Sequence, residues 1–295
     1  MNEKTSTGGI VFAGLLLFVL LSAGVAADTT TTSASVTNAA PSVGAITASD
    51  PITLSESTTA VVQCNATITD NNGYGDVSAA NATFWDVAAT TIGAADDYNN
   101  HYTNTSCSLS GGSGTTINSV CSFIVHYSAN AAEWNCSLTA RDGSSATGSN
   151  TVANMTVNQL KALASDASLS FGTLALGATS STDVNITINN TGNAQIDVQL
   201  GGYAQTTADN FSMNCSVGGS KIPVGNLKWN LTAAQVYANM SALVNDSAAL
   251  TVSDFDLAAE TTDNTASTKK IHWKLQLPST DVGGSCTGNV VVTAI

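Results

Sequence analysis

The residues of this chain that could do chemistry are mainly oxygen donors, cysteines and glycosylation acceptors. Residues 70–76 read Asp-Asn-Asn-Gly-Tyr-Gly-Asp, which places oxygen-bearing side chains at relative positions 1, 3 and 7 of a glycine-containing bend. Calcium accepts carboxylate, amide and backbone oxygens in such loops, so Asp70, Asn72 and Asp76 are candidate ligands. Three further acids could complete the site if they approach it in space: Asp96, Asp97 and Asp142. The bidentate glutamate of an EF-hand is missing, and Asn-Gly also makes a plain structural turn.

Six cysteines without a Cys-x-x-Cys pair, and three scattered histidines, predict three disulfides in an exported chain rather than a zinc site. Four cysteines precede residue 160 and two follow it: Cys64, Cys107, Cys121 and Cys136, then Cys215 and Cys286. Among the three possible pairings of the first four, inward parity favours Cys64–Cys136. Cys107–Cys121 would then clamp a hairpin around the turn-rich residues 110–115. Cys215 and Cys286 are expected to bridge in a second core.

Twelve Asn-x-Ser/Thr sequons provide acceptors for N-linked glycans. They are Asn65, Asn81, Asn104, Asn135, Asn154, Asn185, Asn189, Asn210, Asn214, Asn230, Asn239 and Asn245. Their register matters more than their number. Around Asn65, Asn135, Asn185 and Asn214, apolar residues or cysteines have one parity and the acceptor asparagine has the other. Side chains alternate across a strand, so the cysteines should face a core and these asparagines should face water.

That alternation, broken by Asn, Gly and Asp clusters, predicts an all-β protein. We expect a signal peptide, or an uncleaved N-terminal anchor, over residues 1–27, then a Thr-rich extended tail over 28–40. Two immunoglobulin-like β-sandwich domains should follow, at 41–158 and 168–295, joined by a linker at 159–167. One short helix is expected within the second domain near 233–244, because Thr232 begins a capping box and Val236, Met240 and Leu243 share a helical stripe.

Composition excludes several classes of function. With 8 basic and 21 acidic residues, the net charge of −13 leaves no basic patch for nucleic acid. No nucleophile elbow, phosphate-binding glycine loop or catalytic-triad spacing occurs, so an enzyme is not expected. Membrane contact is expected only through the N-terminal segment, if it stays uncleaved. No cofactor is expected, apart from the candidate calcium. Trp85, Tyr98 and Tyr102 could form a sugar-stacking platform or simply cover a sheet.

Several segments resemble extracellular sandwich families. Residues 41–43, 138–143 and 151–157 resemble the opening and closing strands of cadherin- and PKD-like domains. Residues 168–177, with Phe171-Gly172, and 183–193, ending Asn190-Thr191-Gly192-Asn193, resemble the hydin-type (major-sperm-protein-like) immunoglobulin sandwich. In the latter, Gly192 is expected to take a positive φ in a turn. Residues 273–278 and 286–290 resemble the last strands of archaeal surface-layer and extracellular-filament proteins.

These resemblances imply a secreted, glycosylated structural protein of the cell surface that assembles with itself into a layer or filament. A secreted adhesin or carbohydrate-binding module, with or without a dependence on calcium, is the alternative. A third hypothesis is an accessory domain anchored through an uncleaved N-terminal helix. The tail over residues 28–40 is expected either to donate a strand to a neighbouring subunit or to be a disordered spacer.

Overall fold

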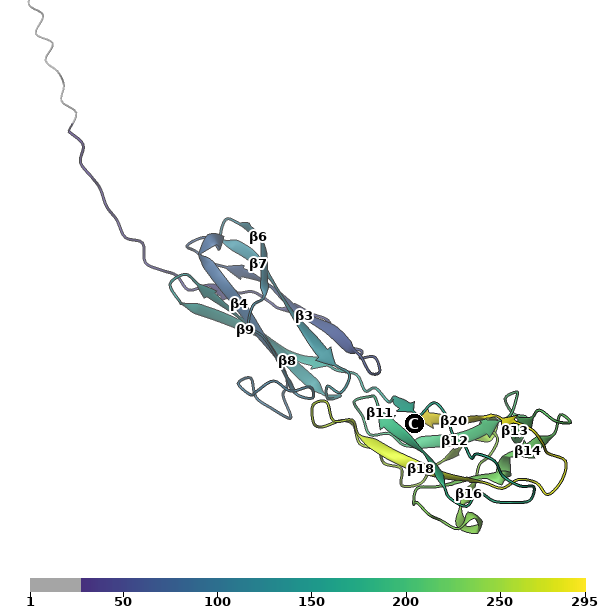
Figure 1. Cartoon of the computed structure of the whole chain (residues 1–295). Helices are drawn as coiled ribbons and strands as arrows, with labels where there is room; N and C mark the ends of the chain where they lie inside the picture. The colour runs from purple at the N-terminus through teal and green to yellow at the C-terminus, as the bar shows by residue number, and fades with distance from the viewer. Residues whose placement is uncertain (1–27) are drawn as a thin grey trace, which may run out of the picture. The chain divides into compact units, whose positions relative to one another are not determined.

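The computed structural model describes residues 28–295, and its regular structure is almost entirely β-strand (Figure 1). Within these residues there are short 3-10 turns but no α-helix, which confirms the all-β expectation. No helix in this part of the chain is long and apolar enough to cross a membrane. The signal segment expected over residues 1–27 lies outside the described residues. Residues Asn38–Ile295 form one compact unit.

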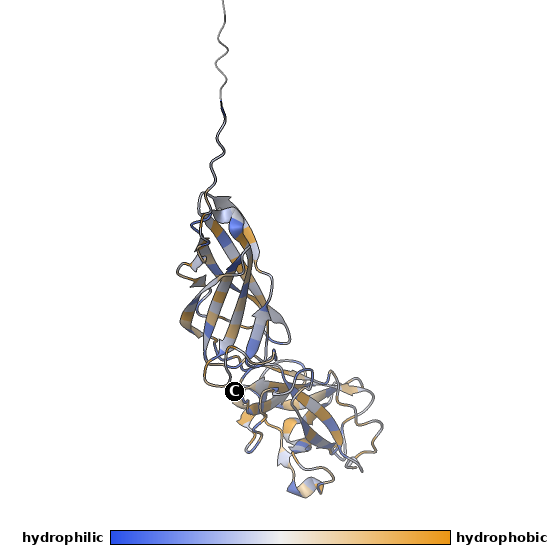
Figure 2. Cartoon of the chain, turned by 90° about the vertical axis from the view of Figure 1, so that its left-hand side faces the viewer, coloured by the Kyte–Doolittle hydropathy of each residue, from blue (hydrophilic) through white to orange (hydrophobic). Residues whose placement is uncertain are grey.

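Apolar side chains gather in two separate clusters, one drawn from residues before Lys161 and one from residues after it. Along the strands, apolar and polar residues alternate, as the colours of Figure 2 show. Each cluster therefore collects the inward side chains of its own sheets, which is the packing of a β-sandwich. The assignment of both to the immunoglobulin-like class stays a prediction.

Two long strands form the centre of the first sheet. β3 (Thr59–Thr69) and β7 (Thr116–His126) pair antiparallel along their whole length. The other strands of this sheet are β1 (Ser42–Val43), β2 (Thr47–Ala48) and β6 (Ser108–Ser113). From Val62 to Ile68, β3 alternates between Val62, Cys64, Ala66 and Ile68 on the buried side and polar residues on the other.

The second sheet of the first cluster has the order β5-β4-β8-β9. Its strands are β4 (Val77–Asp86), β5 (His101–Asn104), β8 (Glu133–Asp142) and β9 (Thr147–Thr156). Phe84 and Trp134 stack at its centre with ring centroids 4.5 Å apart, and both are fully buried. Such aromatic pairs stabilise a core by about 0.5–1.5 kcal/mol beyond the area they bury.

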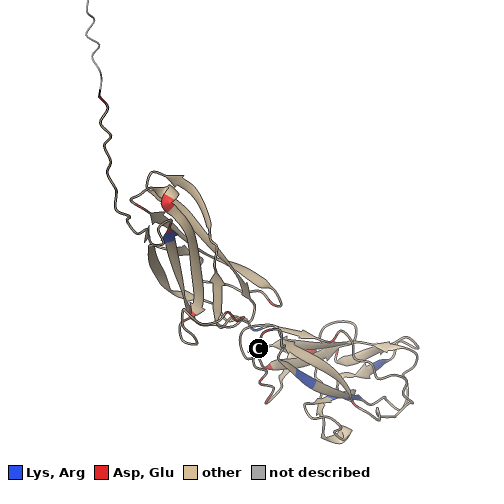
Figure 3. Ribbon diagram, turned by 60° about the vertical axis from the view of Figure 1, so that its left-hand side comes forward, with Lys and Arg blue, Asp and Glu red and all other residues tan. Residues whose placement is uncertain are grey.

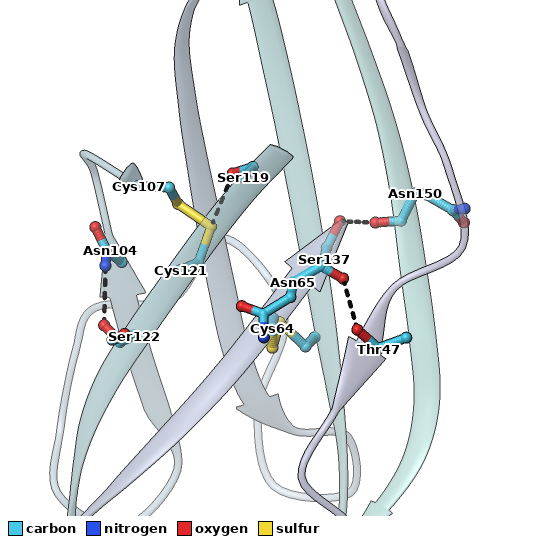
Figure 4. The surroundings of a disulfide bond; sticks show 11 residues. Thr47, Cys64, Asn65, Asn104, Cys107, Ser119, Cys121, Ser122, Ser137 and Asn150 are labelled. Carbon is cyan, nitrogen blue, oxygen red and sulfur yellow. Dashed lines mark hydrogen bonds between the residues drawn. A yellow bond between two sulfur atoms is a disulfide. The ribbon is translucent and has the colours of Figure 1, made fainter. Parts of the chain in front are cut away.

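Two disulfides tie this first cluster together (Figure 4). Cys64 on β3 bonds Cys136 on β8 and so joins the two sheets across the core. Cys107 bonds Cys121 on β7, which clamps the β6–β7 hairpin. Both pairings are those that the sequence favoured.

The second cluster is built from three small sheets, ordered β10-β11-β18-β15-β16, β17-β12-β20 and β14-β13-β19. The first contains β10 (Leu163–Ser165), β11 (Val184–Asn190), β15 (Leu227–Asn230), β16 (Ser241–Ala242) and β18 (Thr268–Leu275). The others contain β12 (Val198–Tyr203), β13 (Phe211–Cys215), β14 (Lys221–Pro223), β17 (Leu250–Thr251), β19 (Cys286–Thr287) and β20 (Asn289–Ala294). Trp273 and Phe255, both fully buried, are the largest side chains of this core.

The third disulfide joins Cys215 and Cys286, which lie directly opposite each other on the neighbouring strands β13 and β19. Cys215 is buried, but Cys286 is half-buried. The bond therefore lies at the margin of the second cluster and staples two adjacent strands, whereas Cys64–Cys136 crosses a core.

The helix expected near 233–244 is absent, and that expectation was wrong. Val236 is extended (φ −68°, ψ 133°) and 65% exposed, and only Tyr237–Asn239 makes one 3-10 turn. Tertiary contacts decide the conformation, because the Tyr237 hydroxyl donates to the Asn226 carbonyl and the Leu243 amide donates to the Leu227 carbonyl. Met240 and Leu243 are buried, but from an extended segment, which the same residue spacing also allows.

The expected linker at 159–167 is also partly ordered structure, since β10 lies within it and pairs with β11. Gly192 serves that packing in a way the sequence did not indicate. Its φ is not positive; instead, a Cβ at this position would lie 2.1 Å from the Leu160 carbonyl oxygen. Glycine is required here because another backbone segment approaches closely.

Within the compact unit, polar side chains bond residues that belong to different clusters. The side-chain amide of the buried Asn193 donates to the Ala129 backbone carbonyl at 2.8 Å, and that of the buried Asn99 donates to the Glu260 backbone carbonyl at 2.7 Å. The Tyr127 hydroxyl donates to Glu260 Oε2 at 2.8 Å. Amide side chains suit such positions because they satisfy backbone carbonyls that water no longer reaches.

Candidate cation site

Three carboxylates meet where three strand ends of the first cluster converge. Asp70 follows β3, Asp76 ends the 3-10 turn Tyr74–Asp76 that leads into β4, and Asp142 is the last residue of β8. One oxygen from each lies within 4.8 Å of the others. The β4–β8 register brings them together, because Val77, next to Asp76, pairs with Asp142.

The loop between Asp70 and Asp76 is shaped by its own backbone. The backbone N–H of Asn72 donates to Asp70 Oδ1 at 2.7 Å, and the backbone N–H of Gly73 donates to the Asp70 carbonyl oxygen at 3.0 Å. Gly73 has a φ of 112°, which is accessible to glycine and strained for other residues. The loop therefore presents the Asp70 carboxylate toward the strand ends and not toward bulk water.

The group carries more negative charge than its surroundings compensate. Asp70 is 0% exposed and Asp142 is 1% exposed. Asp70 Oδ2 is buried and has no hydrogen-bond partner. Arg141, the sole basic residue between Asp28 and Gln159, directs its guanidinium to the Ser145 hydroxyl. Figure 3 shows how sparse basic residues are in this part of the chain. The two ion pairs found among residues 28–295 lie elsewhere.

Asp142 is nevertheless held in its ionised form. The side-chain amide of Asn38 donates to Asp142 Oδ2 at 2.7 Å, and the backbone N–H of Ala146 donates to Asp142 Oδ1 at 2.8 Å. The Asn38 side chain is the main cause that lowers the pKa of Asp142, and backbone amides and Arg141 contribute, against an opposing effect of burial. A second buried carboxylate beside it, Asp70, is the feature that needs a cation.

The sequence-predicted ligands are only partly brought together. Asp70 and Asp76 belong to the carboxylate cluster, whereas Asn72 Oδ1 accepts the Ala39 backbone N–H at 2.7 Å. Asp142 takes the third position. Asp96 pairs with His101, and Asp97 accepts the Asn99 amide, so neither belongs to the cluster. Asn38 was not a sequence candidate, and no local motif marks it.

An all-oxygen cluster without histidine or cysteine suits a hard divalent cation. Calcium–oxygen distances of about 2.3–2.6 Å allow one ion to reach oxygens up to about 5 Å apart, which covers the separation found here. Gly143 adds to this arrangement, because a Cβ at this position would lie 3.0 Å from Asp76 Oδ1. Asp76 is half-buried and Gly143 is exposed, so water reaches the cluster from this side.

The expected aromatic platform does not form. Trp85 lies on the face of β4 opposite the core residue Phe84, as its parity suggested, but it is covered there and only 8% exposed. The Tyr98 ring stacks on His126 at 4.4 Å, and the Tyr102 hydroxyl donates to the Tyr98 carbonyl. Burial is the main cause that raises the pKa of Tyr102. These three rings therefore serve packing and offer no flat exposed surface.

None of the twelve sequon asparagines is buried, although Asn65 is constrained. The buried asparagines among residues 28–295 are Asn99, Asn190 and Asn193, and no sequon contains them at the acceptor position. Asn65 is half-buried between neighbouring strands, and its Oδ1 is enclosed without a partner (Figure 4). This enclosure sets Asn65 apart from the other positions that register predicts to face water.

Comparisons with known proteins add little to this geometry. The chain matches no protein-family profile. It also matches no curated protein. Among solved structures, it is similar to one described as a carbohydrate-binding module of the β-sandwich superfamily, at 12% identity and a TM-score of 0.25, covering 87% of this chain and 97% of the other.

A DUF4466 family protein from Parabacteroides merdae is similar at 10% identity and a TM-score of 0.25, over 82% of this chain and 100% of the other. A chain described as wild-type BspA_C is similar at 12% identity and a TM-score of 0.23, over 87% and 100%. Likenesses this distant carry no argument about function.

Proposed function

We propose that this chain is an exported, glycosylated structural protein of the cell surface that assembles with copies of itself into a layer or filament. The observation that carries the proposal is the sorting of asparagines: every sequon acceptor is half-buried or exposed, while none of the three buried asparagines is a sequon acceptor. All six cysteines are in disulfides, which fits an extracellular protein. No catalytic role is part of the proposal.

The proposed assembly contact is the N-terminal tail. Residues 28–37 are exposed and contain no strand, and no side-chain hydrogen bond found among the described residues involves them. They are rich in β-branched threonine, which favours extended structure. An edge strand of a neighbouring subunit, such as β6 at the end of its sheet, offers backbone groups to such a segment.

Deleting residues 28–37 while keeping the signal segment tests this proposal. The truncated protein should be secreted, folded and glycosylated but should remain monomeric, whereas the full chain should form polymers visible by electron microscopy. Assembly of the truncated protein at the full-length concentration would exclude the tail as the contact. A native intact mass equal to that of the bare polypeptide would exclude the glycoprotein.

The carbohydrate-binding alternative has no specific observation in its favour, because the ring set Trp85, Tyr98 and Tyr102 is occupied in packing. Glycan-array binding by the purified monomer would revive that alternative, through a surface other than these rings.

A further inference from the structure

We propose that Asp70, Asp76 and Asp142 bind one calcium ion, and that this ion fixes the root of the N-terminal tail, Asn38–Ala39, to the first pair of sheets. The inference concerns the same tail that the proposed assembly uses. It can be measured on the monomer, so its failure and the failure of assembly are distinguishable.

The first step is electrostatic. Asp70 and Asp142 are both almost completely removed from water, and their carboxylate oxygens lie within 4.8 Å of each other and of Asp76. Burying neighbouring like charges is strongly unfavourable unless a cation or a proton compensates them. No basic side chain among the described residues forms an ion pair with these carboxylates, because the guanidinium of Arg141 is bonded to the Ser145 hydroxyl.

The second step is the free oxygen. Asp70 Oδ1 accepts a hydrogen bond from the backbone N–H of Asn72, whereas Asp70 Oδ2 is enclosed and has no hydrogen-bond partner. An enclosed acceptor without a partner is rare in folded proteins and calls for a ligand. Calcium accepts this kind of oxygen, and the open side at Gly143 leaves space for the water molecules that complete its coordination.

The third step connects the ion to the tail. Two hydrogen bonds hold residues 38 and 39, and both lead into the cluster. The side-chain amide of Asn38 donates to Asp142 Oδ2, and the backbone N–H of Ala39 donates to Asn72 Oδ1. The backbone N–H of Asn72 in turn donates to Asp70 Oδ1. Calcium that fixes Asp70 and Asp142 therefore also fixes both acceptors of the tail root. By linkage, an ordered tail root raises calcium affinity by the same factor.

Calcium titration of the EGTA-treated full-length monomer, followed by calorimetry, tests the binding step. We expect one saturable site, with magnesium binding at least tenfold more weakly because it loses its water less readily. D76N, at the half-buried position, and D70N, which keeps the shape of the buried side chain, should each weaken calcium binding at least tenfold. E56Q, which changes an exposed carboxylate just before β3, should leave it unchanged.

Absence of saturable binding to the wild-type chain at millimolar calcium would overturn the site. Affinity unchanged in both D70N and D76N would overturn the ligand assignment. Non-reducing peptide maps and circular dichroism identify any variant that fails to fold, and the half-buried position of Asp76 makes D76N the safer of the two.

Hydrogen exchange tests the connection to the tail. Calcium should slow exchange at least tenfold in peptides covering residues 38–40, 70–76 and 142–146, and should leave residues 28–36 unchanged. N38A should still bind calcium but should lose the protection of residues 38–40. If that protection persists in N38A, or if calcium never changes exchange at residues 38–40, the ion binds without controlling the tail root.

Discussion

Backbone amides decide how individual carboxylates behave in this protein. Asp209 is the clearest case. Its two oxygens accept amides from Ala204, Gln205, Thr206 and Phe211 at 2.9–3.4 Å. Burial alone would raise the pKa of Asp209, but these four donors outweigh burial and lower it far below the usual range. The ionised side chain organises the whole turn between β12 and β13.

We expect D209N to lower the melting temperature at pH 7, because one amide oxygen cannot replace a charged acceptor of four N–H groups. The folded pKa is depressed, so this stabilisation is present above the unfolded value of about 4 and is lost as the pH falls toward the folded value. Thermal denaturation from pH 7 to pH 2 should show the wild type and D209N converging in acid, with E56Q as control. A pH-independent gap between them would contradict the charge argument.

Gly192 makes a second prediction at this scale. G192A should destabilise the protein by about 1–3 kcal/mol, because the added Cβ meets the Leu160 carbonyl and backbone cannot yield as a side chain can. G93A is the matched control, since no atom lies within 4 Å of the position that its added Cβ would take and its φ is ordinary. Urea unfolding of both variants measures the difference. Equal midpoints would show that the β10 segment moves away at no cost.

The disulfides make the corresponding prediction at the scale of elements. The Cys64–Cys136 bond joins residues that are 72 positions apart in the sequence, and the Cys107–Cys121 bond joins residues that are 14 positions apart. The chain-entropy argument predicts that the free energy of unfolding falls by about 4 kcal/mol when the first pair is replaced by alanine and by about 3 kcal/mol when the second pair is replaced. Urea unfolding should therefore rank C64A/C136A below C107A/C121A. The reverse order would mean that local clamping of the hairpin outweighs cross-linking of the sheets.

The fold class could be predicted from sequence because alternation is local: the buried parity of Val62, Cys64 and Ile68 is visible in the chain itself. The helix could not be excluded, because Val236, Met240 and Leu243 fit a helical stripe as well as an extended segment. What settles that choice is the bond from Tyr237 to Asn226 and the burial of Met240, neither of which is local.

Only part of the candidate cation site could be predicted from the sequence. Asp70 and Asp76 lie in one short loop, so their proximity follows from the sequence. Asp142 joins them through the β4–β8 register, and Asn38 joins through a side-chain bond to a residue 104 positions away. The ligand role of Asn72 stays a prediction. An amide side chain in a loop is free to rotate toward whichever donor the fold supplies, and here that donor is the backbone N–H of Ala39.

At the scale of the whole molecule, charge governs how copies meet. A net charge of −13 with a pI near 4.2 makes copies repel one another at neutral pH. Any self-assembly must therefore overcome this repulsion through specific contacts, screening by salt or bound cations.

Light scattering of unglycosylated protein should show self-association rising as the pH is lowered toward 4.2, and reversing when the pH returns to 7. Salt at pH 7 should produce part of the same effect, since the screening length falls to about 8 Å at 0.15 M. Association that responds to neither pH nor salt would show that charge repulsion does not limit the approach of copies.

The strand register also gives one cysteine a competing partner while the disulfides form. Cys64 and Cys121 face each other directly across β3 and β7, both buried, yet each is bonded to a different cysteine. Directly opposed residues of antiparallel strands lie about 4.5–5.5 Å apart at Cα, within the range that a disulfide spans. A Cys64–Cys121 bond would therefore fit the finished sheet while leaving Cys136 and Cys107 as unpaired thiols. Correct pairing requires that β8 reach Cys64 before its facing neighbour does, or that thiol–disulfide exchange repair the mistake.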